Sequence, residues 1–321
     1  MAVSYAFACG SVRARESGLL TAQERETLLA LRTPEQLTAA LRDRGWGDAA
    51  GLAEGEELLR QENARLWDYL RGVTPDFSLY DAFLVRQDYH NLKATIKGVL
   101  SGRAYAHLLL EPATVSADLL REAVETRKFS LLPEGMAQAA EKAYDRLAHA
   151  ADPQGCDSLL DRAAMAAQRQ AAQASRVALL CEYIDIQIFY QDARIALRAA
   201  RCGKDTAFLK EALCDPDPEL IRAASAGEDE VLGWLERTDR WGSRQVAELY
   251  RKSPSQFEKF AEDQAMACIR RGRQATLGPE PLLGYLAARE TEIRTMRLLY
   301  SGLRAGRSEA DIRERMRELY G

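Results

Sequence analysis

The sequence has few of the residues that β-sheets favour and has no hydrophobic run long enough to cross a membrane. Valine, isoleucine and threonine together make up 32 of the 321 residues, whereas alanine alone accounts for 52. Because branched side chains are typical of strands, a sheet-dominated fold is excluded. No window approaches 18 consecutive apolar residues, and no basic residue precedes Arg13. We therefore expect neither a membrane span nor a signal peptide.

The six cysteines and three histidines are not spaced as a metal site. No C-x-x-C pair occurs, no cysteine lies near a histidine, and no histidine has a glutamate three residues before it. Structural zinc needs clustered thiolates or imidazoles, and carboxylate-bridged sites in helical bundles use Glu-x-x-His pairs. We therefore predict no metal centre, and we expect reduced, mostly buried thiols in a cytosolic protein.

The sequence also lacks a nucleotide site and a set of catalytic residues. Gly203-Lys204-Asp205 contains the single Gly-Lys pair and has neither the upstream glycine nor the following hydroxyl of a phosphate-binding loop. No nucleophile has a plausible base nearby in the sequence. The net charge of −4 gives no general attraction for nucleic acid. We predict a protein that is not an enzyme and that binds no cofactor.

Helix start and stop signals recur along the chain and indicate an all-α fold of about a dozen helices. Thr33 and Ser253 each precede a proline at the first helical position, and Thr21 with Glu24 forms a capping box. Glycine accepts the left-handed conformation that commonly ends a helix. The glycines predicted to end helices are Gly102, Gly203, Gly272 and Gly306.

The longest uninterrupted segment runs from Cys156 to Cys202. It contains neither glycine nor proline, so it is predicted as one helix about 70 Å long at about 1.5 Å per residue. Apolar residues recur in its middle at spacings of three to five and form an approximate stripe. We expect other helices to cover this stripe.

Three segments about one third of the chain apart resemble one another. Residues 88–103 align with residues 189–204 at an offset of 101, and a further offset of 100 reaches residues 289–302. Helical sequences rich in alanine, leucine and arginine also align by chance, so both a triplicated helical domain and coincidence remain open. The equivalent polar residues are Asn91, Asp192 and Glu292, followed by the basic residues Lys93, Arg194 and Arg294.

Prolines suggest two domain boundaries. Glu111-Pro112 and the Asp215–Pro218 segment interrupt helices, because proline disfavours the α conformation in the residue before it. We predict helical domains at residues 1–112, 113–215 and 216–321. The N-terminal helix could also pack beside the C-terminal one, which would blur these linear limits.

Basic charge is concentrated near the C-terminus. Residues 270–321 contain 11 arginines, no lysine and 7 acidic residues, a net charge of +4. Arginine forms bidentate contacts with carboxylate or phosphate and packs its stem on apolar surface, which suits interfaces. The densest cluster, Arg270, Arg271 and Arg273, is therefore a candidate partner interface. The alternative is that the C-terminal charges only solubilise a terminal helix.

Three separated blocks point to one family. They are Tyr5 with Val12–Thr21, then Asp88–Lys93, then Tyr285–Glu290 with Glu292–Arg294 and Asp311–Arg315. These blocks resemble the C subunit of archaeal and bacterial V-type ATPases, whose family includes the d subunit of the eukaryotic central stalk. The resemblance runs from Tyr5 to Leu319. It implies three similar all-helical domains with pseudo-threefold symmetry, arranged as a funnel.

The resemblance also implies a function. In that family the subunit is a non-catalytic socket between the membrane ring of proteolipid subunits and the central shaft of D and F subunits. It couples rotary ion transport to ATP hydrolysis or synthesis at the cytoplasmic face of the membrane, and it is expected to be a monomer when isolated, with no nucleotide or nucleic acid partner. The alternative is an all-helical scaffold or adaptor outside a rotary motor.

Two roles remain open for Lys93, Arg194 and Arg294. They could pair with carboxylates inside each domain, or they could line the implied funnel. Recurrence of a basic residue in each copy favours the structural role, because partner contacts need not be threefold.

Overall fold

The computed structural model describes residues 4–47 and 53–316 of the chain. Within these residues all regular structure is helical, with sixteen α-helices and four short 3-10 helices. The all-α prediction is confirmed, although the number of helices exceeds the dozen expected. No helix in the described ranges is both long enough and apolar enough to cross a membrane. Leu319, where the family resemblance ends, lies outside the described residues.

The chain divides into two compact units. Unit 1 comprises Met1–Phe77 and Leu249–Gly321, and unit 2 comprises Ser78–Glu248. The chain passes between the units within η1 (Phe77–Tyr80) and within α13 (Ser243–Lys252). The three-domain limits, the pseudo-threefold symmetry and the funnel stay predictions.

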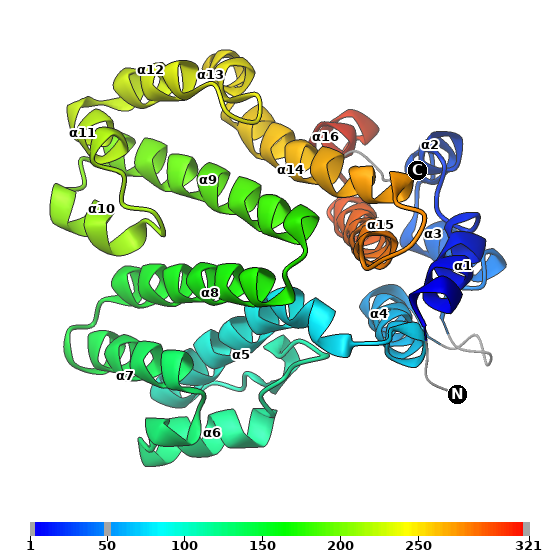
Figure 1. Ribbon diagram of the computed structural model, residues 1–321, viewed down its shortest axis with the longest axis horizontal. Coiled ribbons are helices and arrows are strands. Elements are labelled where there is room, and N and C mark those ends of the chain that lie inside the picture. The colour runs from blue at the N-terminus through cyan, green and yellow to red at the C-terminus, as the bar shows by residue number, and fades with distance from the viewer. Residues whose placement is uncertain (1–3, 48–52, 317–321) are drawn as a thin grey trace. The chain divides into compact units, whose positions relative to one another are not determined.

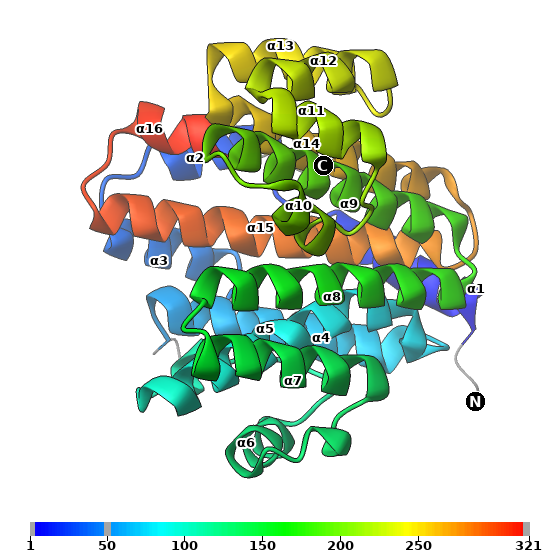
Figure 2. The same ribbon diagram turned by 90° about the vertical axis from the view of Figure 1, so that its left-hand side faces the viewer.

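Unit 1 is built around the helix α15. This helix contacts α1, α3, α4, α14, η4 and α16, and Figure 2 shows it running beside α3. A helix covered on several sides must be apolar over most of its circumference, and most α15 residues are buried. The helices of unit 1 are α1 (Tyr5–Glu16), α2 (Ala22–Leu29), α3 (Pro34–Asp43), α4 (Gly55–Val73), α14 (Pro254–Arg270), η4 (Arg271–Gln274), α15 (Glu280–Arg304) and α16 (Glu309–Arg315).

Unit 2 contains two groups of helices that meet along α8 and α9. In the first group α5, α7 and α8 pack against one another around a continuous apolar core (Figure 2). In the second group α9 packs against α10, α11 and α12 (Figure 1). The elements of unit 2 are α5 (Asp81–Ser101), η2 (Ala106–Leu108), α6 (Ala117–Thr126), η3 (Phe129–Leu131), α7 (Glu134–His149), α8 (Pro153–Ser175), α9 (Ala178–Arg201), α10 (Thr206–Ala212), α11 (Pro218–Ala226) and α12 (Glu228–Thr238).

The prediction of one helix from Cys156 to Cys202 is wrong. Helix α8 ends at Ser175 and α9 begins at Ala178, because Arg176 adopts a left-handed conformation with φ 57° and Val177 is extended. The hydroxyl of Ser175 accepts the N–H of Val177 at 3.2 Å, which stabilises the turn. Helices α8 and α9 therefore lie side by side (Figure 1).

Most of the predicted helix signals have the expected structure. Thr21 and Glu24 form the reciprocal capping box, and the hydroxyl of Thr33 accepts the N–H of Gln36 at 3.3 Å. Helix α14 begins after Ser253, but the Ser253 side chain makes no cap hydrogen bond.

Three of the four predicted helix-ending glycines have left-handed φ angles. Gly102, Gly203 and Gly306 have φ between 62° and 65° at the ends of α5, α9 and α15. Gly272 differs, since it lies inside η4 after α14 has already ended at Arg270.

Candidate partner-binding sites

The polar residues Asn91, Asp192 and Glu292, which align in the sequence, each make a hydrogen bond with a backbone amide. They lie on the long helices α5, α9 and α15, and each side chain is at most 3% exposed. Each accepts a backbone N–H from a segment distant in the sequence, so each fixes a loop against its helix. The donors are the amides of Leu110 at 2.7 Å, Cys214 at 2.9 Å and Leu20, respectively.

The basic residues of the repeat also make contacts inside their own units. Lys93 pairs with Asp161 of α8 within unit 2. Arg294 pairs with Glu262 of α14 within unit 1 at 3.3 Å. Arg194 donates to a side chain of its own helix, α9. Of these three contacts, only Arg294–Glu262 joins a basic residue to a carboxylate of the same predicted domain, since Lys93 and Asp161 belong to different predicted domains and Arg194 bonds the side-chain amide of Gln191. The structural role stays a prediction.

The candidate interface arginines lie at the turn between α14 and α15. Arg270 is the last residue of α14, and Arg271 and Arg273 are exposed residues of η4. The guanidinium of Arg271 donates to the carbonyl oxygen of Cys268 at 3.3 Å, and the carbonyl oxygen of Arg273 accepts from Arg13 at 2.6 Å. The cluster is thus anchored to the body of unit 1.

The hydrogen bond from Arg13 to Arg273 joins α1 to the segment around η4, and each of these two segments carries an exposed apolar side chain. Phe7 of α1 is 60% exposed, and Leu277, between η4 and α15, is 61% exposed. A further hydrogen bond joins α1 to the segment between η4 and α15, from the thiol of Cys9 to the carbonyl oxygen of Gly278 at 3.3 Å. Arginines beside exposed apolar residues are typical of interfaces. We call Phe7, Arg271, Arg273 and Leu277 the α1–η4 surface.

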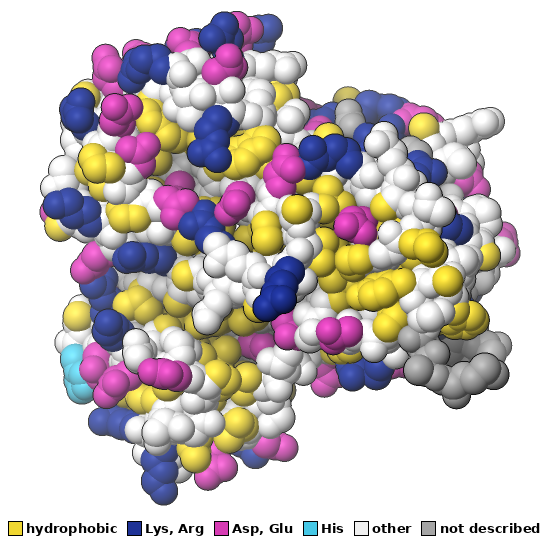
Figure 3. Space-filling model, viewed as in Figure 1, with side chains coloured by type: hydrophobic (Ala, Val, Ile, Leu, Met, Phe, Trp, Pro, Cys, Tyr) yellow, Lys and Arg dark blue, Asp and Glu magenta, His cyan; other side chains and the backbone are white. Residues whose placement is uncertain are grey.

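Charges elsewhere are mixed. On the face of the described residues seen in Figure 3, basic and acidic side chains alternate without forming a large area of one sign. Such a surface favours contacts between individual side chains over a general attraction for a polyanion.

Unit 1 also contains a buried network of charges that the sequence did not reveal. Arg289 of α15 pairs with Glu292 and with Glu62 of α4, and its guanidinium lies 4.8 Å from the ring centroid of Trp46. Burial raises the pKa of Glu292, although Arg289 and the amide of Leu20 oppose this. The i,i+3 spacing of Arg289 and Glu292 could have indicated that these two residues pair, but nothing in the sequence indicated that Glu62 joins them.

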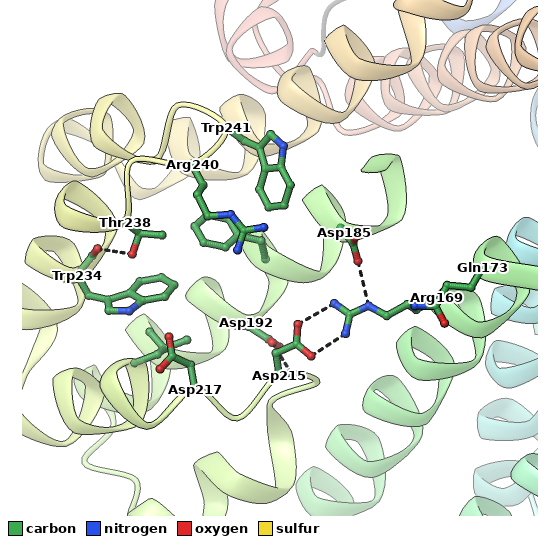
Figure 4. Close-up of a pocket in the computed structure, with 12 residues that line it drawn as sticks. Arg169, Gln173, Asp185, Asp192, Asp215, Asp217, Trp234, Thr238, Arg240 and Trp241 are labelled. Atoms are coloured by element: carbon green, nitrogen blue, oxygen red, sulfur yellow. Dashed lines mark hydrogen bonds and ion pairs between the residues drawn. The ribbon is translucent and has the colours of Figure 1, made fainter. Parts of the chain in front are cut away.

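Unit 2 contains a cavity of about 430 Å³ beside α8, α9, α11 and the end of α12 (Figure 4). Arg169 of α8 crosses one side of it and binds both carboxylate oxygens of Asp215, at 2.6 and 2.7 Å. The same guanidinium donates to Asp185 of α9 at 3.0 Å. Arg169 lowers the pKa of Asp215 and has a raised pKa itself, mainly through this hydrogen-bonded pair.

Asp192 also lines this cavity and holds one of its loops in place. Its carboxylate accepts the N–H groups of Cys214 and Asp215, which fixes the loop that presents Asp215 to Arg169. Burial raises the pKa of Asp192 to about 6, although the two amides oppose the shift. The carboxylate is therefore held in place at an electrostatic cost.

The opposite side of the cavity is aromatic. Phe189 of α9 stacks on Trp234 of α12 with 5.5 Å between ring centroids, and Trp241 meets Phe189 edge-on at 5.5 Å. The guanidinium of Arg240 lies 4.3 Å from the Trp241 ring centroid. The sequence did not predict this site, because its members come from separate helices and only Asp192 stood out in the repeat.

Comparison with known proteins finds one family over nearly the whole chain. The model of the family described as ATP synthase (C/AC39) subunit matches residues 8–315. The C subunit of the V-type sodium ATPase of Enterococcus hirae is 25% identical over 270 residues, covering 83% of this chain and 82% of that protein. The C subunit of the V-type ATP synthase of Thermus thermophilus is 26% identical over 335 aligned residues, covering 97% and 99%. The matched region includes residues of both units.

Proposed function

The chain belongs to the ATP synthase (C/AC39) subunit family, whose V-type members are non-catalytic subunits, and we propose that it is a central-stalk rotor subunit. In this role it joins the membrane ring of proteolipid subunits to the central shaft of D and F subunits. It would work at the cytoplasmic face of the membrane, held there through the ring. The observation that carries the proposal is the family match from residue 8 to residue 315.

The packing within each unit suits a part that transmits torque. Close-packed side chains have low compressibility, so a twist applied at one end of a helix is passed on with little deformation. In unit 1 the core helix α15 is covered by several neighbours, and in unit 2 α8 contacts both α7 and α9. The anchors at Asn91, Asp192 and Glu292 fix loops against the long helices. These contacts support a stiff coupler.

The repeated anchors also support the proposal of three similar helical domains. One polar side chain on each of α5, α9 and α15 accepts a backbone amide. The donors of Asn91 and Asp192 follow them in the chain, at Leu110 and Cys214, whereas the donor of Glu292 is Leu20, near the N-terminus. We retain residues 1–112, 113–215 and 216–321 as their proposed limits.

The α1–η4 surface is the proposed contact with the proteolipid ring. It combines exposed arginines with exposed apolar side chains, and arginine pairs well with acidic groups on a partner. Contacts between exposed charges are screened by salt over about 8 Å at physiological ionic strength. Ring binding is therefore expected to weaken as salt concentration rises.

The test is binding of the full chain to the purified ring and, separately, to the D and F subunits of the same organism. Wild-type chain is expected to bind both, and the R270E/R271E/R273E variant is expected to lose ring affinity at least tenfold while keeping shaft affinity. R222E, a single charge reversal at an exposed position of α11, is the control for a reversal outside this surface. Ring affinity that is unaffected by salt and by the triple reversal would reject the ring assignment, and failure to bind either partner would reject the rotor role.

A further inference from the structure

The cavity of unit 2 is a built site whose chemistry selects one class of group. We propose that it receives a single basic side chain, arginine or lysine, from a partner protein. The cavity belongs to unit 2, whereas the residues assigned to the ring belong to unit 1. The proposal rests on the proposed function only for the identity of the partner. The cavity has a volume of about 430 Å³ and is partly open to solvent, so a side chain from outside could enter it.

The charges that line the cavity favour a cation. Four aspartates face two arginines. The charge of Arg169 is already satisfied by Asp215 and Asp185, so it offers little to an incoming anion. A carboxylate or phosphate would have Arg240 as its cation, but it would share the cavity with four aspartates, whose net negative charge disfavours an anion.

Two of the aspartates keep acceptor capacity. Asp185 is bound to Arg169 through one oxygen, and its side chain is 41% exposed. Asp217 caps α11 by accepting the N–H of Glu219 at 2.8 Å through one oxygen. Figure 4 shows both carboxylates beside the cavity, so an ammonium or guanidinium group there would find charged acceptors.

The aromatic side of the cavity suits the same guest. Phe189 and Trp241 are partly exposed, whereas Trp234 is buried and stacks on Phe189. Aromatic faces attract cations within about 6 Å of the ring centroid. Arg240 already occupies such a position over Trp241, so the side chains accept a guanidinium in this geometry. An acidic guest would gain nothing from these faces.

The loop that carries Trp241 is preorganised by hydrogen bonds within unit 2. Trp241 has φ 47°, an unusual conformation for a bulky residue, and Tyr190 donates a hydrogen bond to its carbonyl oxygen at 2.5 Å. Ser243 also accepts the N–H of Arg240 at 3.0 Å and donates to Leu235. Strained backbone fixed by several contacts is often found at ligand clamps, and it lowers the entropy lost on binding.

The four tryptophans allow a direct test on the full chain. Trp234 and Trp241 line the cavity, whereas Trp46 and Trp67 belong to unit 1. The indole N–H signals of ¹⁵N-labelled protein, assigned by single Trp→Phe variants, are followed while N-acetyl-arginine amide or N-acetyl-lysine amide is added. We expect saturable shifts of Trp234 and Trp241 and none of Trp46 or Trp67. No saturable shift with either probe would overturn the proposal.

Matched probes and variants test the charge requirement. N-acetyl-citrulline amide has the shape of arginine without the charge and is expected to bind at least tenfold more weakly, and N-acetyl-glutamate amide is expected to produce no shift. D217N keeps a helix-capping side chain and is expected to weaken arginine binding at least threefold, whereas D118N, on exposed α6, leaves it unchanged. Equal binding of citrulline or glutamate, or no effect of D217N, contradicts the proposal.

The outcome is separable from that of the proposed function. If the chain binds shaft and ring subunits but its cavity tryptophans ignore both basic probes, the cavity proposal fails and the rotor role stands. If the tryptophans respond to the basic probes while the chain binds no V-type subunit, the rotor role fails and the cavity chemistry stands.

Discussion

At the scale of single residues, the buried carboxylate of Asp192 makes stability depend on pH. Burial raises its pKa to about 6 from the ordinary 3.8, so between these values the folded chain holds more protons than the unfolded chain. The contribution of this group to the free energy of unfolding is therefore complete below about pH 4 and is lost as the pH rises through 6. At about 1.4 kcal/mol per pKa unit, the loss is about 3 kcal/mol.

The D192N variant isolates this effect from other titrating groups. Its free energy of unfolding, measured by urea denaturation, is expected to gain about 3 kcal/mol relative to wild type as the pH rises from 4 to 7. A difference that stays constant over this range would show that Asp192 titrates normally.

The buried network in unit 1 gives a second prediction at this scale. Arg289 pairs with Glu62 and Glu292, and all three side chains are at most 10% exposed. Arg289→Ala would remove the cation that pairs with Glu292 and would leave Glu62 with Arg65, at 3.4 Å. We expect a loss of about 3–5 kcal/mol in the free energy of unfolding.

The control is Arg297→Ala on the same helix. Arg297 pairs with Glu56, but its side chain is 49% exposed, so we expect a loss below about 1 kcal/mol. Chemical denaturation of both variants gives the comparison. If Arg289→Ala and Arg297→Ala lower the free energy of unfolding by similar amounts, burial does not make the Arg289 ion pairs more important than an exposed pair.

At the scale of elements, the turn between α8 and α9 stores backbone strain. Arg176 is left-handed, a conformation that costs a non-glycine residue about 1–2 kcal/mol. Arg176→Gly removes this strain but adds flexibility to the unfolded chain, so we expect a net gain of about 0.5–1 kcal/mol. Gln170→Gly, at an exposed helical position of α8, is expected to lose about 1 kcal/mol. The free energy of unfolding of both variants is measured by urea denaturation. If Arg176→Gly destabilises the chain as Gln170→Gly does, Arg176 is not strained.

The same turn marks the limit of prediction from the sequence. Helix starts at Thr21, Thr33 and Pro254 could be predicted because a cap or a proline acts locally. The end of α8 could not be predicted, because an arginine takes the conformation usually left to glycine. Packing of α8 against α9 and the hydrogen bond from Val177 to Ser175 favour that conformation.

The candidate site was less predictable than the fold, because tertiary packing brings its residues together. Asn91, Asp192 and Glu292 were found because three segments of the sequence align at offsets of 101 and 100. The cavity joins Arg169, Phe189 and Trp234 from three helices, and no local spacing relates them. Their proximity follows from how α8, α9 and α12 pack.

At the scale of the whole molecule, the two units differ in how the chain forms them. Unit 2 is one continuous segment with its own apolar core, whereas unit 1 needs both ends of the chain. Residues 78–248 expressed alone are therefore expected to be helical and to unfold cooperatively in urea. Residues 1–77 alone lack α15 and are expected to be largely unfolded. A non-cooperative transition of the 78–248 fragment would contradict its independence.

In the proposed rotor role, this chain couples the shaft to the ring without chemistry of its own. The most direct measurement is ATP-driven ion transport by a reconstituted V-type complex assembled with and without the chain. Without it, we expect the catalytic head to hydrolyse ATP while transport falls to background, and adding the chain back should restore transport. Transport that proceeds equally well in its absence would contradict the account.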